Sequence, residues 1–377
     1  MDLVLTEEQT MLQRAAKDFV ASRSPMKRVR QVVGHAASGE GYSRELWKEM
    51  AKLGWLGLTI AEEHGGSALG HRYAMVVLEE LGKGLVPEPF VSTVMLGAAA
   101  IELGGSKSQR SEHLAAIAAG ERLFALAHQE AGTRYALAAV DTSADAKDGG
   151  YALRGEKVHV MDGPLADFFI VSARARDGIA LFVVPASAKG VTVEKQSRLD
   201  GRSAALVRFD GVMAAEDARL GAPEKGLALL ERVVDVGTIG LCAEMLGAMT
   251  AAFAMTLEYL KTREQFGVAI GTFQALQHRA ARLYVETELA RSAVMFAHGV
   301  LDGLDVNASA ARAASVAKAK CSDAFMLVAH EAVQMHGGIG MTEEHDLGLY
   351  VKRARVAEMT FGDAAYHRDR FGRLGGF

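Results

Sequence analysis

No proline follows Pro223, and this absence constrains the fold of the chain more than any other feature. The remaining residues are rich in Ala, Leu, Met, Glu and Arg, most of which are strong helix formers. Because proline breaks helices, a long stretch without it permits long uninterrupted helices. The pattern predicts three such helices, over residues 226–263, 272–303 and 309–336.

The first part of the chain also has apolar residues at helical spacing. Thr6 and Gln9 form a plausible capping box before the first predicted helix. Glycines 54, 82 and 120 each follow a predicted helix and are interpreted as stop signals. The further helices predicted in this region cover residues 43–53, 72–81, 92–103 and 107–119.

The middle of the chain has a different texture, with short apolar runs separated by Gly, Asp and Pro. Such runs with turn signals between them favour a small antiparallel sandwich or barrel. We therefore expect an α+β multidomain chain, with a helical domain over 1–120, an antiparallel β-domain over 121–225 and a helical domain over 226–377. The strand candidates are residues 123–127, 168–171, 179–184, 191–193 and 206–209.

Composition narrows the classes of function. The 42 basic and 46 acidic residues give a net charge of −4, so no basic excess indicates nucleic acid or an anionic membrane as partner. The first residues are acidic and lack the basic segment followed by an apolar segment that is typical of a signal peptide. The longest apolar stretches are shorter than the ~18 residues needed to span a bilayer. Two cysteines, Cys242 and Cys321, are too few for a disulfide framework and fit a reducing compartment. We expect a cytoplasmic protein that does not insert into a membrane.

The histidines do not indicate a metal site. His128, His159 and His336 are scattered along the chain and lack the i, i+4 spacing of a helical metal pair. We therefore predict that no metal is bound.

A first candidate binding motif lies between two predicted helices, over residues 259–274. Arg263 offers a fork that can pair with phosphate, Phe266 an aromatic face and Gln274 an amide. The alternative is a solvated helix hairpin whose glycines only turn the chain.

A second candidate motif covers residues 334–344 and contains three glycines between two helices. Glycines let a ligand approach the backbone closely, and a helix start favours an anion. The segment is not a dinucleotide fingerprint, because the third glycine of G-x-G-x-x-G is missing and no strand precedes it. The alternative is a tight turn between helices.

Both motifs, in this order and separation, resemble the signature regions of the acyl-CoA dehydrogenase family. The resemblance extends to residues 46–58 and 62–66, to Glu79–Gly82 and to Gly155–Lys157 with Ala166 and Asp167, and so covers nearly the whole chain. It implies an N-terminal helical domain, a middle antiparallel β-domain and a C-terminal four-helix-bundle domain that bind FAD. It also implies a tetramer built as a dimer of dimers.

The resemblance assigns roles to individual residues. Arg263 is expected to pair with the FAD pyrophosphate, since a planar cation suits two anionic phosphates. Two flavin-side segments depart from the family pattern, because Gln129 and Met161 stand in strands that usually read Thr-Glu-Pro-Gly and Trp-Ile-Thr. Backbone hydrogen bonds to the flavin ring do not depend on these side chains. The other expected contacts are Phe266, Phe273 and Gln274 on the adenine side, and Gln334, Gly337 and Gly338 across a subunit boundary.

The catalytic base of the family has no obvious counterpart. The reaction needs a carboxylate to remove the α-proton of an acyl-CoA while hydride passes from the β-carbon to the flavin. Resemblance places Gly362 at the usual base position and Gly237 at the alternative one. Asp363 is the first candidate in their place, although it also suits the N-cap of a helix. The other possibilities are Asp235 or Glu231 on the long helix, or a subunit without a base that works beside a catalytic partner in a heterotetramer.

The expected function is that of an FAD-dependent acyl-CoA dehydrogenase of lipid catabolism, which passes electrons to an electron-transfer flavoprotein. One alternative is a non-catalytic or FAD-holding subunit of a heteromeric dehydrogenase. Residues 361–368 and 129–135 favour it, because they resemble small subunits of pimeloyl-CoA and steroid side-chain dehydrogenases. The other alternative is a flavin monooxygenase or a relative of nitroalkane oxidase.

Overall fold

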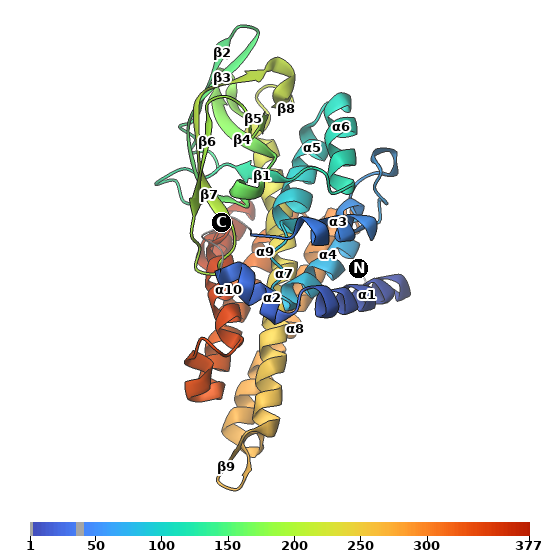
Figure 1. Ribbon diagram of the computed structural model, residues 1–377, viewed down its shortest axis with the longest axis vertical. Coiled ribbons are helices and arrows are strands. Elements are labelled where there is room, and N and C mark those ends of the chain that lie inside the picture. The colour runs from blue at the N-terminus through green and yellow to red at the C-terminus, as the bar shows by residue number, and fades with distance from the viewer. Residues whose placement is uncertain (1–2, 35–40) are drawn as a thin grey trace. The chain divides into compact units, whose positions relative to one another are not determined.

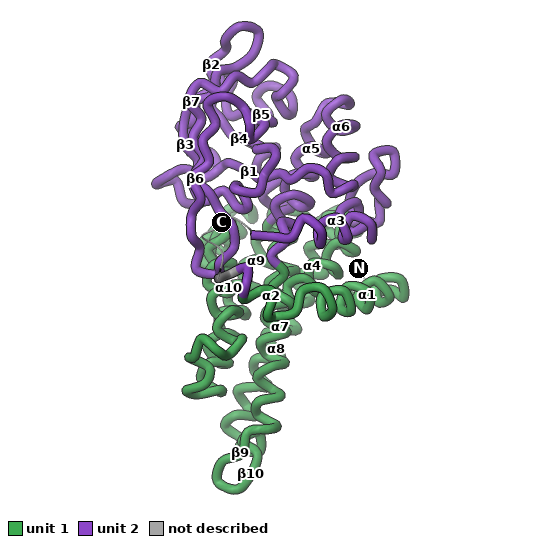
Figure 2. Tube along the Cα trace, in the orientation of Figure 1, with its two compact units in different colours: residues 1–30, 71–86, 238–377 green, residues 31–70, 87–237 purple. Residues whose placement is uncertain are grey.

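A computed structural model describes residues 3–34 and 41–377 of the chain (Figure 1). The chain forms two compact units (Figure 2). Unit 1 contains residues 1–30, 71–86 and 238–377, and unit 2 contains residues 31–70 and 87–237. Domain boundaries near residues 120 and 225 stay a prediction.

Helices make up most of the described chain, and the long proline-free helices lie close to their predicted ranges. The first helix begins with the predicted capping box, in which Thr6 Oγ1 accepts from Gln9 N at 3.2 Å and Gln9 Oε1 accepts from Thr6 N at 3.1 Å. The α-helices are α1 (Glu7–Arg23), α2 (Met26–Gly34), α3 (Arg44–Lys52), α4 (His71–Lys83), α5 (Ala99–Gly104), α6 (Lys107–Ala118), α7 (Gly226–Thr262), α8 (Gln274–Leu301), α9 (Ala310–His336), α10 (Leu347–Met359) and α11 (Ala364–Leu374).

One predicted helix end is wrong. Gly82 does not end its helix, because α4 continues to Lys83. The predicted helix over 92–103 is confirmed as helical, with a π-helix over Val91–Ala98 that continues into α5.

Gly82 instead permits a close crossing of α4 and α7 within unit 1. A Cβ atom at Gly82 would lie 2.1 Å from the carbonyl oxygen of Glu244, and one at Gly247 would lie 1.9 Å from that of Glu79. The two glutamates are themselves buried and paired. Arg291 donates to both carboxylate oxygens of Glu79 at 2.8 and 2.9 Å, and Arg353 donates to Glu244 at 2.9 Å. The crossing therefore joins helices α4, α7, α8 and α10.

Unit 2 contains an eight-stranded sheet in the order β6-β7-β3-β2-β4-β5-β8, in which β1 pairs with β4. The sheet is mainly antiparallel, as predicted, but β1 runs parallel to β4 and β2 pairs parallel with β4 at one position. The strands are β1 (Phe124–Ala127), β2 (Ser143–Lys147), β3 (Gly150–Met161), β4 (Phe168–Ala175), β5 (Gly178–Pro185), β6 (Val191–Gln196), β7 (Ala204–Ala215) and β8 (Arg219–Leu220).

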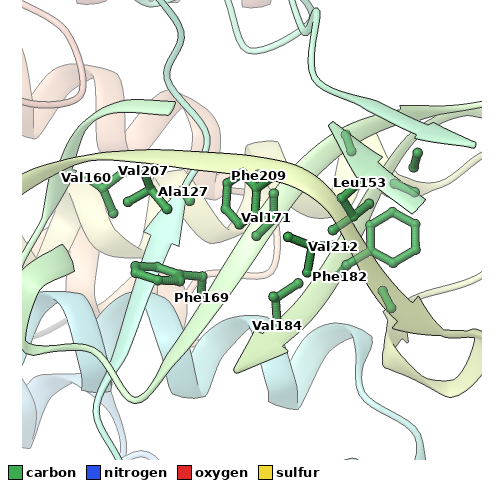
Figure 3. Close-up of a cluster of buried hydrophobic side chains, with 14 of the residues drawn as sticks. Ala127, Leu153, Val160, Phe169, Val171, Phe182, Val184, Val207, Phe209 and Val212 are labelled. Carbon is green, nitrogen blue, oxygen red and sulfur yellow. The ribbon is translucent and has the colours of Figure 1, made fainter. Parts of the chain in front are cut away.

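The apolar runs do not predict strands β2, β3 and β8, because β2 and β3 carry charged residues or a glycine and β8 has two residues. The resemblance alone places Met161, the last residue of β3, on a strand. One buried face of the sheet holds a hydrophobic cluster that includes Val160, Phe169, Phe182 and Phe209 (Figure 3). The cluster fixes the register of β3 against its neighbours, since a shift of one residue would turn its apolar side chains away.

Helix α7 is the most apolar long element. It is long and apolar enough to cross a membrane, but 89% of its most apolar stretch is buried inside the protein. This burial is typical of the core helix of a globular protein.

Candidate functional site

The turn between α7 and α8 is a small β-hairpin at the end of this helix pair in unit 1 (Figure 2). Strands β9 (Glu264–Gln265) and β10 (Val268–Ala269) pair antiparallel. Phe266 and Gly267 join them with φ angles of 56° and 79°, the left-handed pair of a type I′ turn. Arg263 precedes this hairpin directly, so a stable local structure fixes the first motif.

The chemistry-bearing side chains of this hairpin are exposed. The ring of Phe266 is 93% exposed and meets the ring of Phe273 edge-on, with centroids 6.1 Å apart. Arg263 and Gln274 are also exposed. A guanidinium, two aromatic rings and an amide are therefore available to a ligand or to another subunit.

The glycine motif follows α9 in the same unit. Gly337 has φ 65° and ψ −142°, a conformation that favours glycine. A Cβ atom at Gly337 or Gly338 would meet nothing within 4 Å, and both residues are exposed together with Gln334. The backbone here is open to close approach by a ligand.

Stacked rings bring the two motifs together within one chain. The ring of Tyr259, one helical turn before Arg263, stacks on His336, which precedes Gly337, with centroids 4.5 Å apart and planes 24° apart. The ring of His345 meets the ring of His336 edge-on, with centroids 4.7 Å apart. Burial lowers the pKa of His336, so the imidazole is neutral near pH 7 and the stack buries no charge.

Residue types and spacing do not predict this stack, because Tyr259 and His336 are distant in the sequence. The available signal was local: an aromatic residue one turn before the arginine and an imidazole beside the glycine pair.

Among the described residues, no group of three or more His, Cys, Asp or Glu has an arrangement that could hold a metal ion.

Gln129 and Met161 lie in unit 2, on segments that a backbone hydrogen bond joins. Gln129 follows β1, and its carbonyl oxygen accepts from Val158 N at 2.8 Å. Met161 is the last residue of β3, beyond an irregularity between Lys157 and Val160. Both side chains are half-buried.

Gly362 lies in a strained turn between α10 and α11. Phe361 and Gly362 have φ angles of 61° and 116°, and a Cβ atom at Gly362 would lie 2.4 Å from the ring of Tyr366. Lys318, which is buried, donates to the carbonyl oxygen of Gly362 at 2.7 Å. The space that a side chain would need at this position is therefore filled.

Asp363 occupies the N-cap of α11, as the capping alternative predicts. Its Oδ1 accepts from Tyr366 N at 2.9 Å, and the residue is half-buried. The carboxylate thus has a structural role whether or not it also acts in catalysis.

The second glycine position is filled in a similar way, within unit 2. A Cβ atom at Gly237 would lie 2.2 Å from the side chain of Leu96. Asp235 is 4% exposed on the same helix, whereas Glu231 is exposed.

Comparison with known proteins identifies the family. The family models for the acyl-CoA dehydrogenase N-terminal, middle and C-terminal domains match residues 6–121, 124–212 and 224–374. The chain is 29% identical to the probable acyl-CoA dehydrogenase YngJ of Bacillus subtilis, over 98% of both chains. It is 27% identical to subunit CarC of the caffeyl-CoA reductase–Etf complex of Acetobacterium woodii, over 94% of both. Among solved structures it is similar to the ChsE4–ChsE5 complex of Mycobacterium tuberculosis, with a TM-score of 0.90, 28% identity and coverage of 100% of this chain and 99% of that one.

The observed cap predicts how substitutions of Asp363 affect stability. Asp363→Ala should lower the free energy of unfolding by about 1 kcal/mol, because Tyr366 N loses its acceptor. Asp363→Asn should change it by only a few tenths of a kcal/mol, since asparagine is an equally good N-cap. Chemical denaturation measures both values, with the exposed Asp369 of the same helix, replaced by Ala, as control. Equal losses for Ala and Asn would contradict the capping role.

Proposed function

Because this chain belongs to the acyl-CoA dehydrogenase family, we propose that it is an FAD-binding subunit of an enzyme that forms the 2,3-double bond of an acyl-CoA thioester. It is an oxidoreductase of the acyl-CoA dehydrogenase type. We further propose that its electrons pass to an electron-transfer flavoprotein and that it acts in lipid catabolism in the cytoplasm. The similarity to a subunit of an Etf complex supports the acceptor, and the free, buried Cys242 and Cys321 fit a reducing compartment.

The observation that carries the proposed cofactor is the Tyr259–His336 stack, because it places an exposed arginine near an open glycine loop. The residue types fit FAD. Arg263 would pair with the pyrophosphate, and Phe266 and Phe273 would offer aromatic faces to the adenine. Gln274 would add an amide on the same side.

The remaining contacts would come from exposed backbone. Because the stack holds Gly337 and Gly338, with Gln334, beside the Arg263 loop of the same chain, both motifs would approach one dinucleotide across the same subunit boundary, where side chains at the glycines would obstruct it. In unit 2, the segments of Gln129 and Met161 would offer backbone hydrogen bonds to the flavin ring. When bound at these residues, FAD would supply the acceptor for the hydride that leaves the β-carbon.

Removal of the α-proton needs a base, and two sources fit the observations. Asp363 is the candidate within this chain, next to the glycine at the usual base position. The second source is a paralogous subunit in a heterotetramer. The filled space at both Gly362 and Gly237 favours this second source, and the ChsE4–ChsE5 complex is a relative that assembles from two different chains.

A subunit interface fits the exposed half of α8. Tyr284, Val285 and Leu289 are 59%, 52% and 51% exposed in the chain alone. Apolar side chains grouped on one helix mark protein interaction sites. We propose that this part of α8 contributes to a homotetramer or heterotetramer.

The role of Arg263 is tested by FAD binding. Arg263→Gln should weaken FAD affinity about 10- to 100-fold, because a hydrogen bond to a charged group contributes roughly 1.5–3 kcal/mol. Titration of apoprotein with FAD, followed by fluorescence, measures the dissociation constant. Arg14→Gln, on the exposed face of α1, is the control. Unchanged affinity in Arg263→Gln would contradict this assignment, and wild-type protein that binds no FAD would contradict the whole proposal.

The role of Asp363 is tested by turnover, with Asp363→Asn as the variant that keeps the cap. If Asp363 is the base, turnover of acyl-CoA should fall at least 100-fold while FAD content stays unchanged. Asp369→Asn is the control. Full turnover in Asp363→Asn would exclude it as base. Wild-type flavin that acyl-CoA bleaches anaerobically only after a paralogous subunit is added would assign the base to that subunit.

The interface is tested by adding charge to α8. Val285→Lys combined with Leu289→Lys should dissociate the tetramer, because burying two ammonium groups in an apolar contact is costly. Light scattering measures the mass in solution. Val306→Lys, at a 90% exposed loop position, is the control. An intact tetramer in the double variant would place the interface elsewhere.

A further inference from the structure

A buried ion pair in unit 2 joins the two segments that carry Gln129 and Met161. The side chain of Lys157 in β3 is fully buried and that of Glu130, which follows β1, is 6% exposed. Lys157 Nζ donates to Glu130 Oε1 at 2.6 Å. Burying two charges is expensive unless every polar group has partners, so the surrounding hydrogen bonds matter.

The carboxylate of Glu130 has a full set of donors. Besides Lys157, its Oε1 accepts from Thr142 Oγ1 at 2.7 Å and from Thr142 N at 3.0 Å. Its Oε2 accepts from Asp141 N at 2.7 Å. Burial alone would raise the pKa of Glu130, but the hydrogen bonds from Lys157 and Thr142 bring it below its usual value. The carboxylate is therefore ionised at pH 7.

The ammonium of Lys157 has two further hydrogen-bond acceptors besides Glu130. Its Nζ also donates to Ser172 Oγ at 3.0 Å and lies 3.5 Å from the carbonyl oxygen of His128. Burial lowers the pKa of Lys157 to about 8, and Glu130 acts in the opposite direction. The amine thus keeps its proton at pH 7 and fixes a backbone carbonyl on the segment that contains Gln129.

The pair also explains why Gly155 and Lys157 are two residues apart. Side chains at this spacing point to the same face of a strand. A Cβ atom at Gly155 would lie 2.5 Å from Thr142 Oγ1 and 2.7 Å from Thr142 Cα. Glycine therefore lets Thr142 reach Glu130, while Lys157 reaches the same carboxylate from the same face.

Beyond Lys157 the strand changes its conformation. His159 has a φ of 53°, and the register of β3 against β7 shifts between Lys157 and Val160. Val158 N donates to Gln129 O at 2.8 Å immediately after the lysine. The ion pair therefore lies at the point where the irregular segment begins and where the two segments are joined by a backbone hydrogen bond.

We propose that Glu130 and Lys157 are positioning residues that fix the backbone of residues 128–130 against that of residues 158–161, so that both segments meet the flavin ring in one geometry. This inference rests on the proposed binding of FAD. It assigns to the Gly155–Lys157 motif a role in tuning the flavin rather than in packing alone.

The test compares Glu130→Gln, Lys157→Met and the double variant with wild type. Each single variant leaves a buried charge without its partner, whereas the double variant removes both charges. We expect each single variant to shift the visible absorption bands and the reduction potential of bound flavin and to weaken FAD binding at least 10-fold. The double variant should recover part of the loss.

The matched control lies on the opposite face of the same strand. Glu156 accepts from Arg208 Nε at 2.8 Å in an exposed pair, so Glu156→Gln should leave the flavin spectrum, the reduction potential and the FAD affinity unchanged.

If the buried variants fail to fold, Thr142→Val provides a milder test. It removes one hydroxyl donor from Glu130 and should still shift the flavin bands and weaken FAD binding two- to fivefold.

Two outcomes would overturn the inference in distinguishable ways. Variants that lose thermal stability but keep the wild-type flavin bands, potential and affinity would show that the pair is only structural, and the proposed function would stand. Wild-type protein that takes up no FAD would remove the proposed function and this inference together.

Discussion

The crossing of α4 and α7 in unit 1 is the contact on which the helical part of the protein depends. Two glycines allow the backbones to approach so closely that each would place a Cβ atom about 2 Å from a carbonyl oxygen of the other helix. Such proximity leaves Glu79 and Glu244 in the core, where an unpaired carboxylate costs several kcal/mol. Arg291 and Arg353 therefore have to come from α8 and α10. The close approach and the two ion pairs thus join α7 to α4, α8 and α10.

Local patterns predicted those parts of the fold that depend on local physics. The capping box of Thr6 and Gln9 and the N-cap at Asp363 follow from side chains that satisfy nearby backbone groups. The long helices beyond Pro223 follow from composition and the absence of proline. Local patterns fail at Gly82, because a glycine near a helix end resembles a stop signal. Its packing partner, Glu244, lies far along the chain and leaves no local pattern.

The sheet and the candidate site depend on contacts that sequence spacing does not reveal. The apolar pattern does not predict strand β3, because its lysine and glycine interrupt it, and the resemblance alone places Met161 on a strand. Both interrupting residues serve a buried carboxylate that another segment supplies. Residue types and resemblance predict the two candidate binding motifs. They do not predict the stack that joins these motifs, because Tyr259 and His336 are distant in sequence and each has an ordinary local explanation.

The two glycines at the usual base positions illustrate how far packing limits chemistry. Tyr366 fills the space beside Gly362, and the positive φ there disfavours any side chain. Leu96 fills the space beside Gly237. Replacing either glycine by glutamate would thus require its neighbour to move before a carboxylate could reach a substrate. The surrounding core therefore leaves no space for a carboxylate side chain at either glycine. The proposed reaction would need a group that the present packing already accommodates, such as Asp363, or a group from another chain.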